Sequence, residues 1–568
     1  MYVLGIWDGH DAGAALIRDN AVVYAANEER FTKRKLEIGF PRNSIKAALA
    51  YAGISPTEVK DISYTTTEFS KTLERLFPGM KESYYKFRRR AILKPRLEGL
   101  RHIAKYSMTS IGILPLAKPI NSHILRRQLS SLGFENFHLH VVEHHLAHAA
   151  SAAFTSGFGR SLVITLDGLG DGLSGTVNIF DNGRLERQFS ISAKDSIGIF
   201  YEQVTNLVGM RELEDEGKVM AMADYSYPFD FKDNRFKDFF KVENGIIKAK
   251  YGPVRQYDLL SRIAWQMPRE QFSYMAQQLL EVILTKFVES AIDNFGIKDV
   301  SFAGGLFSNV KANMKIRELD TLSHWYVFPH MGDGGLALGS ALYTMHKLAG
   351  YSNFDFNAFL GNSYTKAETI EAINSLNTKL EYEEEPVSDI GKHAADIVEE
   401  DNYIFWFQGR MEYGPRALGN RSIIARSDSE AVKEKLNMYV KKREWFQPFA
   451  PAILEEDADR ILEYDNKGTS DYMTMAYKVR EEALDMARSV MHVDKTARPQ
   501  IVRFENPYTD LLRAVKKKSG YGIALNTSFN LHGKPIVMDP ADALNIMLIT
   551  KTRHMFINGI FVTNPAGV

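Results

Sequence analysis

The sequence of 568 residues contains no cysteine. This absence excludes disulfides, iron–sulfur clusters held by thiolates, thiolate zinc sites and a cysteine nucleophile. A chain without cysteine suits a reducing compartment, and its N-terminal MYVLGIWDGHD lacks the basic start and apolar core of a signal peptide. We therefore predict a cytoplasmic protein.

The sequence also lacks a net charge and long apolar runs. Its 70 basic and 70 acidic residues balance, so no overall field favours nucleic acid or an anionic membrane. No stretch approaches the roughly 18 uncharged apolar residues that a membrane-spanning helix needs. We expect neither nucleic acid nor a membrane as a partner.

One stretch departs from this charge balance. Residues 71–128 carry fourteen Lys or Arg against three Asp or Glu. A solvated helical face explains such a run. A basic lip over an anionic ligand, or a contact with an acidic partner, is the alternative interpretation.

Two stretches of the chain repeat one order of elements, which indicates an internal duplication. Residues 2–30 and 162–190 each predict a strand, an acidic turn, a strand, an Asp-Asn turn and a strand. Since 568 residues are too many for one hydrophobic core, we expect an α/β first domain of two related lobes, residues 1–350. The aromatic, Asn-rich residues 351–366 predict a linker to a second domain, residues 367–568.

Two histidines and two acids have the side chains of a metal site. His144 and His148 lie four apart in VVEHHLAHAASAAF, which predicts a helix with both imidazoles on one face. Asp167 ends a predicted strand, and Asp333 lies in a glycine-rich turn after another. Imidazole and carboxylate ligands suit a divalent ion. His145 is expected to point away from that face.

Two further regions are suited to binding phosphate. Gly304 and Gly305 join a predicted strand to a helix that opens near Asn309, a junction that lets a phosphate approach a helix N-terminus. In the second domain, six cations lie in loops rich in glycine and proline, which indicates a site for a polyanion such as a nucleotide triphosphate or an acyl phosphate. These cations are Arg410, Arg416, Arg421, Lys441, Arg443 and Arg498.

Taken in order, eleven motifs resemble the NodU/CmcH family of O-carbamoyltransferases over nearly the whole chain. They are GHDAGAAL, EERFTKRK, HHLAHAASA, LDGLGDG, EGKVMAMADY, GGLFSNVKAN, FPHMGDGGLALG, GRMEYGPRALGNRSI, KREWFQPFAP, HVDKTARPQ and NTSFNLHGKPIV. The resemblance implies a Kae1-like domain of the actin/hexokinase/Hsp70 type, followed by a YrdC-like α/β domain. It also implies an ATP-dependent carbamoyltransferase of a biosynthetic type.

The resemblance implies a two-step reaction. Carbamoyl phosphate and ATP would form carbamoyl adenylate in the YrdC-like domain. The carbamoyl group would then pass to a hydroxyl of a small-molecule acceptor in the Kae1-like domain, which holds a nucleotide and an iron(II)-type divalent metal. A homodimer is a further possibility that the sequence leaves open.

The motifs also imply residue roles. The metal ligands would be His144, His148, Asp167 and Asp333, and His10 would be the general base on the acceptor hydroxyl. Gly304, Gly305 and Asn309 would contact the nucleotide, although Asn309 could instead cap a helix. Carbamoyl phosphate and nucleotide would be bound in the second domain by Arg416, Lys441, Arg443, Arg498, Ser528 and Asn530.

Two positions depart from the family pattern, and one residue has two interpretations. Gln447 stands where the family usually has arginine, which puts the rate and donor preference in doubt. Asp8 precedes His10 in an unusually acidic loop and is expected to contact a polar or cationic acceptor. Lys218 belongs either to the acceptor pocket or to a helix-end ion pair with Glu216.

Two other functions fit parts of the pattern. A tRNA threonylcarbamoyl-transfer enzyme shares the Kae1 fold and the histidine pair, but the second domain and the lack of an RNA surface count against it. A non-enzymatic nucleotide-binding regulator would keep the glycine turns, but it has no need for His10 together with four metal ligands.

Overall fold

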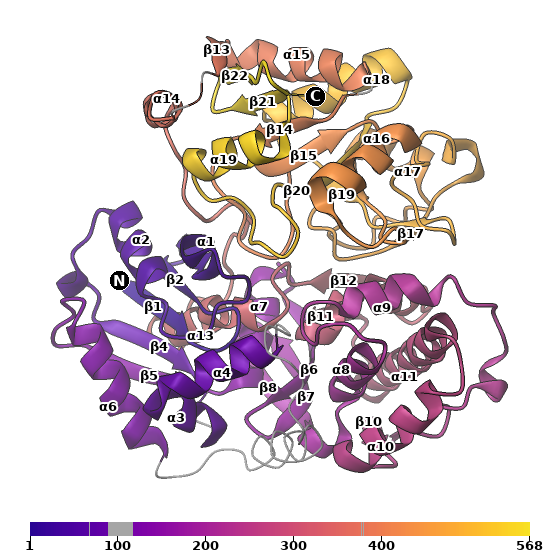
Figure 1. Cartoon of the computed structure of the whole chain (residues 1–568). Helices are drawn as coiled ribbons and strands as arrows, with labels where there is room; N and C mark the ends of the chain where they lie inside the picture. Colours follow the sequence, from indigo (N-terminus) through magenta and orange to yellow (C-terminus); the bar gives the residue numbers. More distant parts are fainter. Residues whose placement is uncertain (67–68, 89–116, 377, 379, 401, 568) are drawn as a thin grey trace. The chain divides into compact units, whose positions relative to one another are not determined.

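A computed structural model describes residues 1–66, 69–88, 117–376, 378, 380–400 and 402–567 of the chain. It contains two compact units (Figure 1). The first is Met1–Glu28 with Leu36–Phe356, and the second is Glu29–Lys35 with Asn357–Val568. Much of the basic stretch 71–128, including Arg89 and Arg90, lies outside the described residues.

The first sheet of the first unit has five strands. Their order is β3 (Ala21–Asn27), β2 (Gly13–Arg18), β1 (Tyr2–Trp7), β4 (Asp61–Thr65) and β5 (His138–Val142). The first three strands in sequence are antiparallel neighbours, and β4 and β5 continue the sheet in parallel. The antiparallel strands β1, β2 and β3 form a meander with short turns. The turn between β1 and β2 therefore lies at the carboxyl end of β1, the central strand of the sheet.

The second sheet repeats this order strand for strand. It runs β8 (Arg184–Ser192), β7 (Leu173–Asp181), β6 (Arg160–Gly170), β11 (Asp299–Ala303) and β12 (His324–Val327). Again the meander is antiparallel and the last two strands are parallel. The repeat confirms the predicted α/β fold with a duplicated actin/hexokinase/Hsp70-like domain.

Two helices pack against each other and connect the two sheets. Helix α7 (His144–Thr155) packs on β6 and β11, whereas α13 (Leu336–Ala349) packs on β1, β2 and β4. The helices approach closely because Gly339 lacks a side chain: a Cβ there would lie 2.0 Å from the Ala147 carbonyl oxygen. This contact holds the histidine-bearing helix against the glycine turn that precedes α13.

Other helices of the first unit surround its sheets. The longest, α11 (Arg269–Phe295), ends at left-handed Gly296, as its apolar spacing and terminal glycine predict. It packs against α8, α9 and α12. The helices of this unit are α2 (Arg42–Ala52), α3 (Phe69–Leu76), α4 (Pro78–Arg88), α6 (Ala117–Ser130), α8 (Ile197–Leu207), α9 (Glu216–Ala223), α10 (Pro253–Ala264) and α12 (Val310–Arg317).

The second unit is built on an eight-stranded mixed sheet. Its order is β13 (Glu381–Glu384), β22 (Ile560–Thr563), β21 (His554–Ile557), β14 (Ile404–Phe407), β15 (Arg421–Ala425), β20 (Ile523–Ser528), β16 (Ala450–Leu454) and β19 (Gln500–Val502). Helices α15 (Val387–Glu399) and α18 (Pro507–Ser519) bury an apolar core against it, with Trp406 and Phe556 fully buried. This unit is α/β as predicted, and its YrdC-like character stays a prediction.

Candidate metal and anion sites

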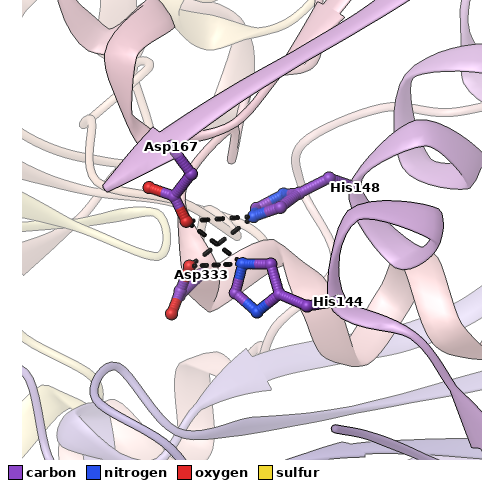
Figure 2. A group of neighbouring side chains, drawn as sticks. All are labelled: His144, His148, Asp167 and Asp333. Atoms are coloured by element: carbon purple, nitrogen blue, oxygen red, sulfur yellow. Dashed lines mark hydrogen bonds and ion pairs between the residues drawn. The ribbon is translucent and has the colours of Figure 1, made fainter. Parts of the chain in front are cut away.

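The structure brings the four predicted metal ligands together in one cluster (Figure 2). His144 and His148 lie on α7, Asp167 on β6, and Asp333 in the turn Asp333–Gly335 before α13. The Nε2 atom of His144 is 3.1 Å from Asp167 Oδ2 and 3.5 Å from Asp333 Oδ1. The Nε2 atom of His148 is 3.6 and 3.5 Å from the same two oxygens.

These separations fit a bound divalent ion. Donors about 2.1 Å from one ion lie roughly 3.0–3.4 Å from each other, close to the observed spacing. The Nε2 atom of His148 is buried and has no hydrogen-bond partner among the described residues, although it faces both carboxylates. A buried imidazole nitrogen that faces two carboxylates without a hydrogen bond suits a metal ligand. Two imidazoles with two carboxylates suit zinc, iron(II) or manganese.

The charges of the cluster compensate each other. Burial opposes the charged imidazole of His144, but the Asp333 and Asp167 carboxylates outweigh it and raise its pKa to about 10. Burial likewise opposes ionisation of Asp167, yet the neighbouring His144 and His148 hold its pKa well below the usual range. Without an ion, a proton on His144 balances the acids, and metal binding would release it.

Residues around the cluster fix the orientation of His144. Its backbone N–H donates to Asp171 Oδ2 at 2.8 Å, and the Thr66 hydroxyl donates to the same carboxylate. A Cβ on Gly170 would lie 2.2 Å from the His144 ring, so only glycine leaves room for it. Sequence reasoning missed Asp171 and Gly170, although both lie in the LDGLGDG motif that contains Asp167.

The predicted general base lies beside the cluster. His10 Nε2 is 3.3 Å from Asp333 Oδ2, and its side chain is 31% exposed. Trp7 donates from its ring N–H to the His10 carbonyl at 2.8 Å, and its ring meets both His10 and His144 edge-on. His10 can therefore reach both the cluster and a molecule entering from solvent, while its predicted role stays a prediction.

Asp8 has a partner that the sequence did not reveal. Arg75 on α3 donates from Nε and Nη2 to the two Asp8 oxygens, both at 2.8 Å, and both side chains are buried. Arg75 also donates to Asn121. The bidentate pair fixes the acid in the loop ahead of His10. Contact of Asp8 with an acceptor stays a prediction.

Lys218 and His145 also have protein partners. Lys218 Nζ lies 3.1 Å from Asp215 at the start of α9, while Glu216 accepts from the Leu213 N–H at 2.6 Å. The helix-end ion pair therefore forms with Asp215 and not with Glu216. His145 turns away from the cluster, and its Nδ1 lies 3.0 Å from the Thr165 hydroxyl.

Two of the predicted nucleotide residues of the first unit, Gly304 and Gly305, lie against Leu166 and Asp167 of β6. Gly304 has a φ of 104°, and a Cβ on it would meet the Leu166 carbonyl oxygen at 2.1 Å. The Gly305 N–H donates to Asp167 Oδ1 at 3.3 Å. Asn309 caps α12 by accepting from the Ala312 N–H at 3.0 Å. The glycines thus allow the β11 turn to pack on β6, and nucleotide contact stays a prediction.

A second cluster, in the second unit, holds cations only. Lys441 ends a short π-helix and donates to Ser528 and Asn530, including Asn530 Oδ1 at 2.9 Å. Arg443 stacks over Phe449 at 3.9 Å and donates to the Gln447 carbonyl at 3.3 Å. We call Arg416, Lys441, Arg443 and Arg498 the cation cluster.

No described carboxylate compensates this cation cluster. Arg416 and Arg498 have neither an ion-pair nor a hydrogen-bond partner among the described residues. Burial lowers the pKa of Arg416 and of Arg443 to about 10. Burial also lowers the pKa of Lys441 and Arg498 well below their usual range, and neighbouring cations add to the effect. Desolvated like charges without a counter-charge are the properties of an anion site.

Two arginines that the sequence analysis grouped with these cations bind backbone carbonyls instead. Arg410 donates to the carbonyls of Leu360 and Gly361. Arg421 is fully buried, stacks over Phe407 at 3.5 Å and donates to four backbone carbonyls. Both guanidinium groups hold loops together through these bonds to backbone carbonyls.

The sequence models of two carbamoyltransferase regions match this chain. The model described as carbamoyltransferase N-terminus matches residues 2–342, and the one described as carbamoyltransferase C-terminus matches residues 395–564.

Curated relatives align along most of the chain. An uncharacterized protein of Methanocaldococcus jannaschii is 32% identical over 558 residues, 96% of each chain. The nodulation protein NolNO of Sinorhizobium fredii is 32% identical over 573 residues, 97% of this chain and 79% of that protein. The nodulation protein U of Rhizobium tropici is 32% identical over 290 residues, 50% of this chain and 47% of that protein.

Among solved structures, component A of the (R)-2-hydroxyglutaryl-CoA dehydratase of Acidaminococcus fermentans covers 61% of this chain and 98% of its own, at 14% identity and a TM-score of 0.34. The fold assignment therefore depends on the repeated strand order of the two sheets. Among the described residues, none of the helices has the length and apolar character that crossing a bilayer requires.

Proposed function

This chain belongs to the carbamoyltransferase family and is an enzyme that transfers carbamoyl groups, and we propose that it does so in two ATP-dependent steps. In the first step, carbamoyl phosphate and ATP form carbamoyl adenylate in the second unit. In the second step, the carbamoyl group passes to a hydroxyl of a small-molecule acceptor in the first unit.

The observation that carries this proposal is the uncompensated charge of the cation cluster. Carbamoyl phosphate and ATP are anions, and their phosphates would supply the counter-charge that Arg416 and Arg498 lack among the described residues. Lys441 is held by Ser528 and Asn530, so its ammonium group is already positioned when an anion binds. Water would first cleave carbamoyl phosphate to carbamate and inorganic phosphate. The carbamate oxygen would then attack the α-phosphorus of ATP, giving carbamoyl adenylate and pyrophosphate, whose developing charge the same cations would stabilise.

In the transfer step, the acceptor hydroxyl attacks the carbamoyl carbon and AMP leaves. His10 would take the hydroxyl proton on its Nε2 atom, because that atom lies beside Asp333 and the side chain is partly exposed. Asp333 would stabilise the imidazolium that forms. His144, His148, Asp167 and Asp333 would hold a divalent ion, which we propose is iron(II) and which supplies charge neutralisation for phosphate groups.

The reaction can be tested in two assays on the purified chain. Pyrophosphate release from ATP should require carbamoyl phosphate, and omission of either compound should abolish it. Release that is absent with ATP, carbamoyl phosphate and iron(II) all present would contradict the adenylate step.

The acceptor can be sought with isotope-labelled carbamoyl phosphate and a metabolite extract. Mass spectrometry should find the label on a small hydroxylated product. Label found on tRNA, and on none of the small molecules, would favour threonylcarbamoyl transfer instead. Metal analysis of anaerobically purified protein tests the identity of the ion separately from both assays.

A further inference from the structure

Two buried amide side chains join the segments that carry the cation cluster. Gln500 lies on β19 and Asn526 on β20, and their exposed fractions are 2% and 1%. The Nδ2 atom of Asn526 donates to Gln500 Oε1 at 3.1 Å. We call these two residues the amide pair. Neither residue belongs to the cation cluster, and the two-step reaction proposed above gives neither a role.

The amide pair binds the loop that follows Arg416. The Nε2 atom of Gln500 donates to the Leu418 carbonyl at 2.8 Å. The Nδ2 atom of Asn526 donates to the Ala417 carbonyl at 3.1 Å. Both of these loop residues are buried, and buried carbonyls need such partners. The two bonds therefore fix the backbone that comes immediately after Arg416.

The amide pair also lies next to other members of the cation cluster. Gln500 follows Arg498 by two residues, and Asn526 precedes Ser528 by two residues on β20. The Ser528 hydroxyl accepts from Lys441 Nζ at 3.2 Å. The amide pair therefore links three segments of the second unit: the loop just described, the segment of Arg498 and the strand that anchors Lys441.

Another residue fixes the internal shape of the loop after Arg416. One carboxylate oxygen of Glu412 accepts from three backbone N–H groups of the loop at 2.8–3.0 Å, those of Leu418, Asn420 and Arg421. Because the loop is shaped by these bonds, the bonds from the amide pair do something different. They set the position of the whole loop relative to β19 and β20.

The amide pair carries a cost for the fold. The Oδ1 atom of Asn526 is buried and has no hydrogen-bond partner among the described residues. A buried polar atom in this state lowers the free energy of unfolding. Packing alone does not explain an amide at this place, whereas its N–H donors, which hold the loop of Arg416 on β20, do explain it.

We propose that Gln500 and Asn526 are positioning residues of the anion site, which hold Arg416 at a fixed separation from Arg498 and Lys441. An anion with several phosphate oxygens needs its cationic partners at fixed separations, because a displaced donor loses its contact. The ligand class is a pyrophosphate-containing or acyl-phosphate anion. This inference depends on the proposed function, because it concerns the site that would bind carbamoyl phosphate and ATP.

The test is titration calorimetry of the full chain with inorganic pyrophosphate as the probe. Gln500→Met keeps the length of the side chain and removes both of its hydrogen bonds. It should weaken binding about 10-fold, because Arg416 is no longer held in place.

The matched control is Gln203→Met, in the first unit. Gln203 is also buried, its Nε2 donates to the Pro253 carbonyl at 2.8 Å, and its Oε1 accepts from Gln256 at 3.1 Å. This variant should lower the melting temperature to a similar degree, since it loses bonds of the same kind. It should bind pyrophosphate like the wild type.

Double variants distinguish the positioning of Arg416 from a general effect on the fold. When Arg416→Gln is already present, Gln500→Met should weaken binding by no more than about 2-fold further, because the residue that it positions is lost. When Arg443→Gln is present instead, Gln500→Met should again weaken binding about 10-fold. Equal further weakening in the two backgrounds would overturn the inference, because the effect would not depend on Arg416.

Asn526→Ala removes the bond to the Ala417 carbonyl and should show the same dependence on Arg416, so the inference stays testable if Gln500→Met does not fold. If Arg416→Gln weakens binding while both amide variants bind like the wild type, the amide pair has no positioning role and the anion site stands. If the wild type does not bind pyrophosphate, the proposed anion site fails and this inference fails with it. Thermal melting confirms that each variant is folded at the temperature of the titration.

Discussion

The two candidate sites of this chain differ in how their charges are balanced. In the first unit, two imidazoles face two carboxylates at 3.1–3.6 Å, and each ionised group has an opposite partner. In the second unit, four cations are desolvated, and among the described residues none of them forms an ion pair with an acid. We propose that the first site binds a cation in place of a proton and that the second binds an anion. We therefore expect that a substitution can disable one site without disabling the other.

The largest expected effect is the loss of carbamoyl transfer in the variant His144→Ala. This variant removes one of four ligands and leaves the two carboxylates facing one imidazole. Carbamoyl transfer should fall about 1000-fold, the order of effect for loss of a group that acts in the transition state. Bound metal should fall with it, as measured by elemental analysis.

Pyrophosphate release by His144→Ala should persist, because the cation cluster is untouched. His123→Ala, on α6 and outside both sites, is the control. Equal loss of pyrophosphate release and transfer would show that the two sites do not divide the reaction as proposed.

Arg498→Met should instead lose pyrophosphate release and retain the bound metal. Pyrophosphate release should fall about 100-fold, since one charged contact to the bound anion is lost. Metal content should not change. The melting temperature should rise, because folding no longer desolvates an uncompensated guanidinium. A fall in melting temperature would mean that Arg498 stabilises the fold rather than binding an anion. The charges of the second site would then be compensated like those of the first.

Both sites could be predicted from sequence only in part. The histidine pair and the two acids were identifiable because helical spacing and strand ends place such residues on one face or edge. The repeated Asp-Asn turns likewise revealed the duplication. Each of these patterns involves residues close together in the sequence, so the geometry of a single helix, strand or turn is enough to predict its structure.

Tertiary contacts decided the rest. Arg75 pairs with Asp8 across 67 residues, without a local pattern that marks it. Arg421 and Arg498 look alike in sequence, yet the first donates to four backbone carbonyls and the second has no partner among the described residues. The assignment of residues 29–35 to the second unit could not be predicted either, because their sequence does not differ in kind from that of their neighbours in the first unit.

A smaller effect, about 10-fold to 30-fold, is expected from Gly170→Ala. The added Cβ would lie 2.2 Å from the His144 ring, which must shift within the cluster. Metal affinity should fall by the amount typical of disturbed ligand orientation, with pyrophosphate release unchanged. Gly159→Ala is the control, since a Cβ there meets nothing within 4 Å. Unaltered metal affinity in Gly170→Ala would show that His144 is not held by this contact.

The smallest effect is expected from Gln447→Arg, which adds a cation to the uncompensated site. The Gln447 carbonyl already accepts from Arg443, so the new guanidinium would start next to the cluster. The KM for carbamoyl phosphate in the pyrophosphate assay should fall about 3-fold, the effect of one partly solvated charge. The melting temperature should fall as well, because a further like charge is confined there. Gln447→Met, similar in length and uncharged, should change neither value. If Gln447→Arg lowers stability without lowering KM, the added charge repels its neighbours without reaching the anion, and position 447 lies outside the binding site.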